Sequence, residues 1–323
     1  MGNKMIYKRI PYVDKPVSQI VYGTAINTMM RGENAFELLD QVYEAGINTF
    51  DTAALYGDSE ASLGEWISAR NLRDKVVVLS KGANPTQWRN RLTTYDIMSD
   101  IETSFAKLKT NYIDIYLLHR DDPYIHVGPI VELLNQLHNE GRIGAFGGSN
   151  WSVERIEEAN LYAKEHSLIP FSISSPCFGL AEQIGDPWGG SVTIAGEKNK
   201  KSREWYVKNQ MPVFAYSSLA RGFFSGRIKS NEMHKAKEIL GITAEEYAFQ
   251  ENFEKLRRAE ILAEEKGVSV TQIAFAWINK QPLNIFPITS SSSIENLNKN
   301  IYAIHIDLTD REIKWLNLEY ENL

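Results

Sequence analysis

Residues 46–60 of the chain read GINTFDTAALYGDSE, and this stretch decides the fold. It opens with a short apolar run that ends in an acid, Asp51, and a phenol, Tyr56, follows five residues later. A glycine turn and the start of a helix at Ser59 come next. A strand that carries a carboxylate and a tyrosine at its C-terminal end indicates a functional site. The structural alternative is that Asp51 caps a turn and Tyr56 is a half-buried aromatic residue.

The strand–helix pattern of this stretch is repeated along the chain. Short apolar runs alternate with amphipathic segments, which indicates βα units and a parallel sheet. The apolar runs span residues 20–23, 47–51, 76–81, 113–119, 143–149, 171–174, 213–216 and 285–288. Helices are predicted over residues 33–45, 59–69, 94–109, 129–139, 152–165, 202–209, 253–266, 271–279, 297–303 and 310–319, with Ser59 and Ser152 as N-caps. Eight such units in about 300 residues predict an α/β protein with a (β/α)8 TIM barrel.

An open, doubly wound sheet is the alternative to the barrel. Its dinucleotide fingerprint G-x-G-x-x-G is absent from the first strand–helix connection, GTAINTMMRGE at residues 23–33. We therefore expect one barrel domain over residues 1–323, with an N-terminal β-hairpin within residues 5–20. Residues 182–196 and 220–246 exceed ordinary loop length, and we expect them to be functional loops at the C-terminal face.

The composition of the 323 residues excludes several classes of protein. Hydrophobic residues make up 43% and charged residues 24%, as in ordinary globular domains. The formal net charge is −6 and no long basic block occurs, so we expect no nucleic-acid partner. One cysteine, Cys177, allows no internal disulfide, and no spacing suggests a metal site. Without a signal peptide or a membrane helix, the chain is expected to be cytoplasmic, with no membrane partner.

Ionisable residues stand at the ends of neighbouring strands, where the active sites of barrels lie. Three successive apolar runs end in Asp51, Lys81 and His119. Two later runs end in Ser149-Asn150 and Tyr216-Ser217. Taken singly, Lys81 could be a solvated strand end and His119 a structural histidine. Together with Tyr56 they predict an active site.

The grouping has a chemical logic. A tyrosine has a pKa near 10, and a nearby ammonium is expected to lower that pKa by stabilising the phenolate. Asp51 would hold Lys81 charged and in place, and His119 would orient a carbonyl and assist proton delivery. The set therefore predicts a tuned proton donor, Tyr56, opposite an electrophilic carbonyl. With one cysteine and no metal cluster, the reductant must be a bound cofactor.

Six ordered motifs resemble those of the aldo-keto reductase superfamily. They are GINTFDTAALYG, VVVLSK, LLHRDDP, GRIGAFGGSNW, AYSSLARGFFSGR and TSSSSIENLNKNI, and the resemblance runs from about residue 20 to about residue 303. It implies a barrel that binds a nicotinamide cofactor, usually NADP(H), without a Rossmann fold. It also implies an NAD(P)H-dependent oxidoreductase that reduces an aldehyde, ketone or sugar carbonyl to an alcohol, or catalyses the reverse.

The resemblance assigns roles to individual residues. Tyr56 is implied to be the general acid, Lys81 and Asp51 to tune it, and His119 to orient the substrate. Cofactor contacts are implied for Gly23, Thr24, Asp51, Ser149, Asn150, Ser175, Tyr216, Ser217, Leu219, Arg221, Gly222, Ser290, Ser291, Ser293, Asn296 and Asn300. Within this list, Ser149 and Asn150 match residues that bind the carboxamide of the nicotinamide, and Tyr216 matches the aromatic residue that stacks on the nicotinamide ring.

Two positions depart from the family pattern. Ser175 stands where a glutamine usually bonds the carboxamide. The segment 289–293 is almost all hydroxyls, and Asn296 stands where an arginine usually pairs with the 2′-phosphate. Hydroxyls and a helix N-terminus can still bind a phosphate, and NADP(H) remains the expected cofactor because the family resemblance implies it. NAD(H) or dual use is the alternative.

The substrate pocket is the least constrained part of the prediction. Aromatic residues on the loops, which can equally be ordinary packing residues, are the candidates: Tyr22 (or Ile26), Trp88, Trp151 and Trp188. A small-molecule carbonyl or alcohol is the expected partner, and the oligomeric state stays open. A cofactor-binding sensor or regulatory subunit with little turnover is the alternative function. A barrel isomerase or lyase that uses Lys81 as a Schiff-base amine is a third, against which the neighbouring Asp51 and the cofactor motifs argue.

Overall fold

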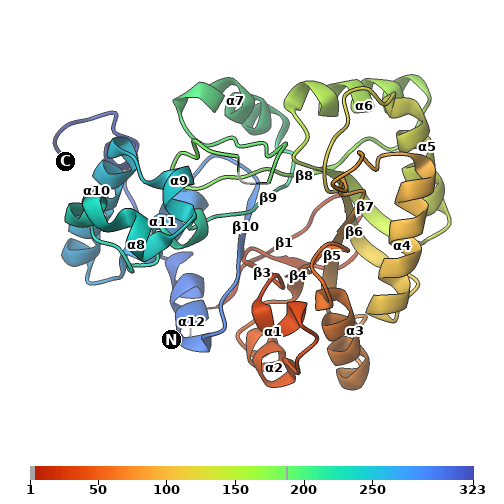
Figure 1. Cartoon of the computed structure of the whole chain (residues 1–323), viewed down its shortest axis with the longest axis horizontal. Helices are drawn as coiled ribbons and strands as arrows, with labels where there is room; N and C mark the ends of the chain where they lie inside the picture. The colour runs from red at the N-terminus through yellow and green to blue at the C-terminus, as the bar shows by residue number, and fades with distance from the viewer. Residues whose placement is uncertain (1–3, 187) are drawn as a thin grey trace.

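A closed barrel of eight parallel strands forms the centre of the computed structural model, which describes residues 4–186 and 188–323 (Figure 1). The strands are β3 (Val21–Gly23), β4 (Thr49–Asp51), β5 (Val77–Gly82), β6 (Ile113–Leu118), β7 (Ile143–Ser149), β8 (Ile173–Ser175), β9 (Val213–Ala215) and β10 (Ile285–Thr289). They follow one another around the barrel in chain order, and β10 closes it on β3 with Ile288 opposite Val21. The predicted TIM barrel is confirmed, and each strand overlaps one of the apolar runs.

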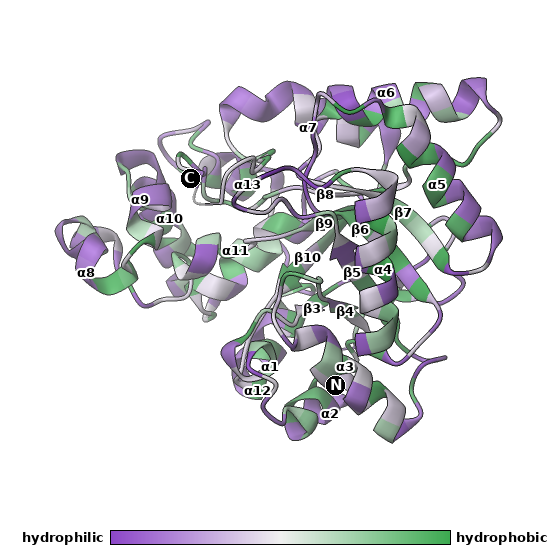
Figure 2. Ribbon diagram, turned by 45° about the vertical axis from the view of Figure 1, so that its right-hand side comes forward, coloured by the Kyte–Doolittle hydropathy of each residue, from purple (hydrophilic) through white to green (hydrophobic). Residues whose placement is uncertain are grey.

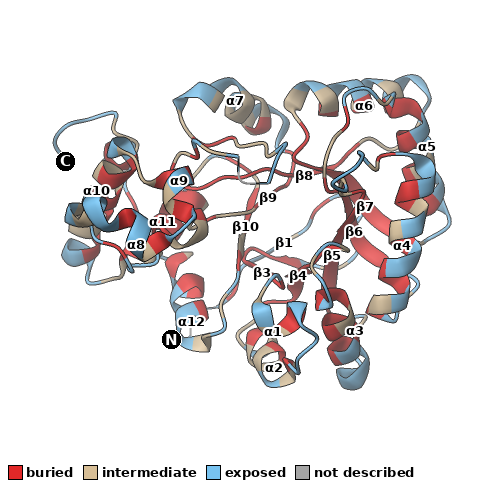
Figure 3. Cartoon of the chain, viewed as in Figure 1, coloured by how far each residue is buried: buried red, intermediate tan, exposed pale blue. Residues whose placement is uncertain are grey.

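Helices surround the barrel. The longer ones are α2 (Phe36–Glu44), α3 (Ser59–Arg70), α4 (Thr94–Leu108), α5 (Val127–Asn139), α6 (Val153–Glu165), α7 (Lys200–Asn209), α10 (Gln250–Lys266), α11 (Val270–Asn279), α12 (Ile294–Ala303) and α13 (Asp310–Leu316). The helices α4 and α5 bury one face, and α11 is buried along most of its length. In α4 the buried side chains include Ile97, Ile101 and Phe105, which recur at helical spacing. Figure 2 shows hydrophobic and hydrophilic bands on α4 and α5, and Figure 3 shows the strands beneath them buried. Each predicted helix overlaps one of these ten.

The two predicted N-caps had different outcomes. Ser152 caps α6 as expected, because its hydroxyl accepts a hydrogen bond from the Arg155 N–H. Ser59 does not cap α3: the helix begins after Asp58, without a side-chain cap. The Ser59 hydroxyl is instead buried and donates to the Thr24 carbonyl at 2.9 Å, which also accepts from the Ile26 N–H at 2.7 Å. Ser59 therefore ties the loop after β3 to α3.

Side-chain alternation along the strands separates two apolar layers. The inward-facing layer fills the barrel with Val21, Val77, Leu79, Ile115, Leu117, Ala145, Ile173, Phe214 and Phe286, and the hairpin adds Ile10, Val13 and Val17. The outward-facing layer, which includes Phe50 and Phe146, packs against the helices. A residue two positions further along a strand faces the same way. Polar residues that follow the inward layer therefore stand on an apolar floor at the C-terminal end.

The predicted hairpin covers the N-terminal end of the barrel. Its strands, β1 (Tyr7–Lys8) and β2 (Val17–Ser18), pair antiparallel. Between them Lys15 reaches the buried Asp114 of β6, with Nζ 2.6 Å from Oδ1, and Arg73 lies 2.9 Å from the same carboxylate. The Lys15–Asp114 ion pair therefore joins the hairpin to the barrel, and Arg73, from the segment between α3 and β5, adds a second cation to the same buried acid.

The second long stretch contains helices that were not predicted. Residues 220–246 include η2 (Ala220–Gly222), η3 (Ser230–Lys235) and α8 (Ala236–Leu240), and α9 (Thr243–Tyr247) follows. The short α1 (Asn27–Met30) and η1 (Glu197–Asn199) were also missed. Segments of three to six residues are too short to show helical periodicity. Over the described residues, the structure has no helix that is both long and apolar enough to cross a bilayer.

Candidate active site

The C-terminal ends of β4, β5 and β6 bring three ionisable residues together. Asp51 pairs with Leu79 across β4 and β5, and Lys81 pairs with Leu117 across β5 and β6. His119 directly follows β6, and its N–H donates to the Gly82 carbonyl at 2.7 Å. Lys81 and His119 each stand two residues beyond an inward-facing leucine, so both belong to the layer above the apolar floor.

Asp51 and Lys81 form a buried ion pair. The Lys81 Nζ lies 2.6 Å from the Asp51 Oδ1, and the two side chains are only 3% and 5% exposed. Burial lowers the pKa of Lys81, but Asp51 and Tyr56 raise it by more, so the ammonium stays charged at neutral pH. Burial raises the pKa of Asp51, and Lys81 opposes that shift. The same ammonium donates to the Thr52 carbonyl at 2.8 Å, which fixes its position.

The loop after β4 brings Tyr56 to this pair. Its turn requires Gly57, which has φ +57°, and a Cβ there would lie 2.5 Å from the Met30 carbonyl oxygen. The Lys81 Nζ lies 3.5 Å from the Tyr56 hydroxyl and 4.9 Å from the ring centroid. Tyr56 is half-buried as a residue.

The prediction that the pKa of Tyr56 is lowered is wrong: the net effect of its surroundings is to raise it. Burial raises the pKa of Tyr56, and the Lys81 ammonium lowers it by less, so the pKa lies above its ordinary value. Desolvation disfavours the phenolate more than one nearby charge favours it. Tyr56 therefore keeps its proton at neutral pH, as a proton donor must.

His119 faces Tyr56 as a neutral imidazole. The two rings meet edge to face with centroids 5.9 Å apart. Burial, together with the positive charges of Lys81 and Arg120, holds the pKa of His119 well below its usual range. The His119 Nδ1 is buried and has no hydrogen-bond partner in the described part of the chain. A neutral ring has one N–H to donate and one nitrogen to accept.

We expect His119 to make folding stability depend on pH. The unfolded chain protonates His119 below about pH 6.5, while the folded protein resists it, so stability falls as the pH decreases through that window. The slope from this group approaches about 1.4 kcal/mol per pH unit. Urea unfolding of the protein and of His119→Asn, at several pH values between about 7.5 and 5, measures it. Equal slopes for the two proteins would contradict the neutral buried imidazole.

A chain of hydrogen bonds links the ends of the next strands. The Asn150 Oδ1 accepts from the Tyr216 hydroxyl at 2.6 Å, and its Nδ2 donates to the Ser149 Oγ at 3.0 Å. Ser149 donates to the Ser175 carbonyl at 3.0 Å, and the Ser175 hydroxyl donates to the Phe214 carbonyl at 2.7 Å. The four predicted carboxamide and ring contacts therefore lie together. Ser175 is fully buried and has only acceptor capacity left for a ligand.

The two long loops meet above Tyr216. The Trp188 ring lies edge to face with Tyr216 at 6.2 Å, and the Arg221 guanidinium lies over the Trp188 ring at 4.9 Å. Arg221 also forms an ion pair with the buried Glu246. Loop 182–196 and loop 220–246 are thus joined through one stacked arginine.

The loop after β9 has an unusual backbone. Ser217, Ala220, Arg221 and Gly222 all have positive φ, at 53°, 50°, 51° and 94°. The Gly222 N–H donates to the Leu219 carbonyl, which closes the turn. Non-glycine residues in this region of φ/ψ are rare and cluster at ligand sites, and such turns form anion-binding concavities.

The end of β10 and the start of α12 carry the hydroxyl-rich segment. The Ser290 hydroxyl donates to the Gly23 carbonyl at 2.8 Å, Ser291 donates to the Ser293 carbonyl at 3.0 Å, and Ser293 caps α12 by accepting from the Asn296 N–H. A Cβ at Gly23 would lie 2.5 Å from the Ser290 Oγ, so a larger residue there would require the Ser290 side chain to move. Asn296 is exposed on the first turn of α12, and the nearby Lys299 pairs with Glu295 at 2.7 Å.

Buried polar atoms support a ligand along this face. The Thr24 Oγ1 and the Asn300 Oδ1 are buried and, within the described residues, have no hydrogen-bond partner. Such atoms are costly unless a ligand or water satisfies them. They lie among the residues predicted to contact the cofactor, so the donor set fits a polar, elongated nicotinamide dinucleotide.

Two predicted substrate residues are wrong. Tyr22 faces outward on β3, where it packs against Phe50 and donates its hydroxyl to the Ser291 carbonyl. Trp151 is fully buried against Phe171 and over Gly148. Tyr22 has the outward parity of β3. Trp151 follows the end of β7, where Asn150 has φ +59°, and its ring packs over Gly148 on the outer side of the strand. Both residues therefore lie in the layer between barrel and helices.

Two other predicted substrate residues stay exposed, and one neighbour was missed. Trp88 is 86% exposed on the loop after β5, and Trp188 is 48% exposed beside Tyr216. Ile26 is partly buried against the outer core. Arg120 lies beside His119 and was not assigned a role, although its position directly after a candidate catalytic residue was a signal.

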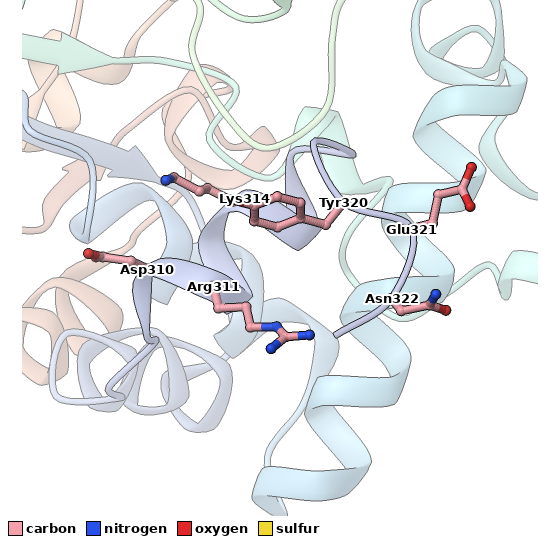
Figure 4. Close-up of a pocket in the computed structure, with 6 residues that line it drawn as sticks. All are labelled: Asp310, Arg311, Lys314, Tyr320, Glu321 and Asn322. Carbon is pink, nitrogen blue, oxygen red and sulfur yellow. The ribbon is translucent and has the colours of Figure 1, made fainter.

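A separate hollow lies at the C-terminal end of the chain (Figure 4). It measures about 570 Å³ and is lined by Asp310, Arg311, Lys314, Tyr320, Glu321 and Asn322. Its residues come from α13 and the tail, and none comes from the end of a barrel strand, so we do not connect it with the chemistry. Among the described residues, no cluster of three or more potential metal ligands occurs. Cys177 is buried, which raises the pKa of its thiol to about 11.

Comparison with known proteins places this geometry in context. The family model of the Aldo/keto reductase family matches residues 19–317. A probable aryl-alcohol dehydrogenase, AAD4, of Saccharomyces cerevisiae is 29% identical over 89% of this chain and 88% of its own length. An aryl-alcohol dehydrogenase of Phanerodontia chrysosporium, with NADP(+) in its name, is 30% identical over 89% of this chain and 76% of its own. A norsolorinic acid reductase B of Aspergillus parasiticus is 27% identical over 90% and 75%.

Proposed function

The chain belongs to the aldo/keto reductase family, and from that premise we propose that it is an NAD(P)H-dependent oxidoreductase that interconverts carbonyl compounds and alcohols. The observation that carries the proposal is the convergence of Asp51, Tyr56, Lys81 and His119 at one end of the barrel. The names of the relatives support an aromatic aldehyde, ketone or alcohol as substrate and NADP(H) as cofactor. The free thiol of Cys177 supports a reducing compartment such as the cytoplasm.

In this proposal the protein supplies a proton at the carbonyl oxygen. Tyr56 keeps its proton at neutral pH and donates it as negative charge develops on the oxygen. The Lys81 ammonium, 3.5 Å from the phenol oxygen, stabilises the phenolate that remains, and Asp51 holds the ammonium in place. Neutral His119 orients the carbonyl through its ring N–H. When bound, a reduced nicotinamide supplies the hydride that the carbonyl carbon accepts.

The cofactor would lie along the hydrogen-bonded face described above. Ser149 and Asn150 would hold the carboxamide, and Tyr216 would stack on the ring. The positive-φ turn from Ser217 to Gly222 would bind the pyrophosphate through backbone N–H groups. The hydroxyls of Ser290, Ser291 and Ser293, with the N-terminus of α12, would bind the 2′-phosphate, and Asn300 the adenine.

The direct test is turnover of a small panel of aldehydes and sugars by the purified protein. With NADPH and benzaldehyde, we expect reduced cofactor to be consumed and benzyl alcohol to form in equal amounts. Cofactor binding without turnover of any compound in the panel would favour the alternative function, a cofactor-binding sensor or regulatory subunit.

We expect the preference for NADPH over NADH to be smaller than usual for the family, because Asn296 provides no charge for the 2′-phosphate. Asn296→Arg should tighten NADPH binding by about tenfold through a charge-assisted hydrogen bond and leave NADH binding unchanged. Fluorescence titration of both cofactors measures this. Asn298→Arg, an equal charge change at another exposed position of α12, is the control. A preference for NADPH of several thousandfold before any substitution would show that another basic group reaches the phosphate.

A further inference from the structure

One guanidinium beside the proposed proton donor has no part in that mechanism. Arg120 directly follows His119, and its Nη1 donates to the His119 carbonyl at 2.9 Å. Its Nε donates to the Gly189 carbonyl at 3.2 Å, so the side chain bridges the end of β6 and loop 182–196. Arg120 is half-buried, and its Cδ packs against Gly190. These contacts hold the guanidinium at the mouth of the barrel.

Arg120 has no carboxylate within ion-pair distance among the described residues. The nearby acids are occupied: Asp121 pairs with Arg155 at 2.9 Å, and Asp122 accepts from the Asn90 amide at 3.0 Å. On the facing loop, the Asp186 carboxylate accepts the Ser191 N–H at 3.2 Å. By contrast, Arg155 and Arg221 at the same face each have a carboxylate partner. In the described part of the chain, no carboxylate therefore neutralises the Arg120 guanidinium, and an anionic ligand can pair with it.

The charge of Arg120 reaches the reacting groups. Burial has the largest effect on the pKa of all three groups: it raises the pKa of Tyr56 and Tyr216 and lowers the pKa of His119. The positive charge of Arg120 has a smaller effect and lowers the pKa of each. Those three side chains surround the place where the carbonyl and the nicotinamide would meet. Arg120 directly follows His119 and donates to its carbonyl, so the guanidinium lies at the mouth of the barrel beside the proposed position of a bound substrate.

We propose that Arg120 binds an anionic group on the substrate, so that the protein prefers aldehydes or ketones that carry a carboxylate or a phosphate a few bonds from the carbonyl. A guanidinium has five N–H donors, and Arg120 uses two on backbone carbonyls, which leaves three (5 − 2) for a ligand. Carboxylates and phosphates match this fork geometry and form its strongest hydrogen bonds. The inference rests on the proposed function and specifies the substrate class of the same site.

The test compares matched pairs of substrates. The carboxybenzaldehydes with the acid at the 2, 3 or 4 position are compared with benzaldehyde, and glyceraldehyde 3-phosphate is compared with glyceraldehyde. We expect kcat/KM for the preferred acid to exceed that for its neutral partner by about 10- to 100-fold. The two pairs separate a carboxylate from a phosphate as the group that is bound.

Three variants assign the preference to the guanidinium. Arg120→Met should bring the acid-to-neutral ratio of kcat/KM close to one, and Arg120→Lys should keep part of it. Arg9→Met, which removes one charge from the hairpin at the far end of the barrel, should leave the ratio unchanged. A ratio near one in the unmodified protein, or an equally large ratio in Arg120→Met, would overturn the inference. The inference would also be overturned if Arg120→Met lowered the affinity for NADPH by a larger factor than it lowered the acid-to-neutral ratio of kcat/KM. That result would show that the guanidinium binds the cofactor.

A binding measurement keeps the inference separate from the proposed function. Calorimetric titration of the NADP+-loaded protein with benzoate should show binding that Arg120→Met weakens by about tenfold or more. Benzoate binding without turnover of any aldehyde would reject the proposed function and keep the anion site. Turnover of aldehydes with no effect of Arg120→Met on benzoate binding would reject the anion site alone.

Discussion

Tyr56→Phe is expected to lower kcat/KM for benzaldehyde by about 100- to 10,000-fold, the usual contribution of a general acid. The substitution removes only the hydroxyl, which in the folded protein has a long 3.5 Å contact with the Lys81 Nζ. Folding and NADPH binding should therefore change little. Steady-state kinetics and a fluorescence titration of NADPH on the same preparation separate the chemical step from cofactor binding.

The control for Tyr56→Phe is Tyr95→Phe. Tyr95 is 78% exposed on the first turn of α4 and does not belong to the group of Asp51, Tyr56, Lys81 and His119, so the loss of its hydroxyl should leave kcat/KM unchanged. Full turnover in Tyr56→Phe would show that another group donates the proton. An equal loss of activity and of NADPH affinity would show that Tyr56 serves binding.

Lys81→Met is expected to cost about 3–5 kcal/mol of unfolding free energy at neutral pH, because it leaves Asp51 buried and unpaired. Asp51→Asn combined with Lys81→Met should recover most of that loss, since neither buried charge remains. Activity should fall in both proteins, because the phenolate of Tyr56 loses the nearby ammonium. Urea unfolding of the single and double variants measures the difference.

The pH dependence of Lys81→Met has a definite sign. Without the ammonium, burial raises the pKa of Asp51 in the folded protein further above its pKa in the unfolded chain. At pH values between these two pKa values, the folded protein therefore binds more protons than the unfolded chain. The stability of Lys81→Met should therefore rise as the pH falls through that window, and its deficit should shrink. A deficit that neither changes with pH nor recovers in the double variant would contradict the buried ion pair.

The barrel and the position of the catalytic candidates could be predicted because both follow from side-chain alternation. The apolar runs before Lys81 and His119 alternate between the barrel interior and the helix layer, so the last residue of each run faces the mouth. Tyr22 directly follows the inward-facing Val21, so its side chain points outward. Trp151 follows the end of β7 and packs on the outer side of the barrel. Both are therefore packing residues, and aromatic character alone did not distinguish them from a pocket wall.

The electrostatics of the site could not be predicted from proximity in the sequence. The motif indicates that Lys81 lies near Tyr56, which lowers the phenol pKa, but the opposing effect of burial depends on how the long loops cover the site. The stacking of Trp188 under Arg221 and the pairing of Arg221 with Glu246 join residues 25 or more apart, and no local pattern specifies them. Short helices within residues 220–246 are set by the same long-range packing.

The measurement that tests the central proposal most directly is isotope transfer from NADPH that carries deuterium at both C4 positions to benzaldehyde in ordinary water. We expect benzyl alcohol with deuterium on the carbinol carbon, and almost no product from Tyr56→Phe, as the proposed mechanism requires. Unlabelled product, or labelled product formed at full rate by Tyr56→Phe, would contradict it.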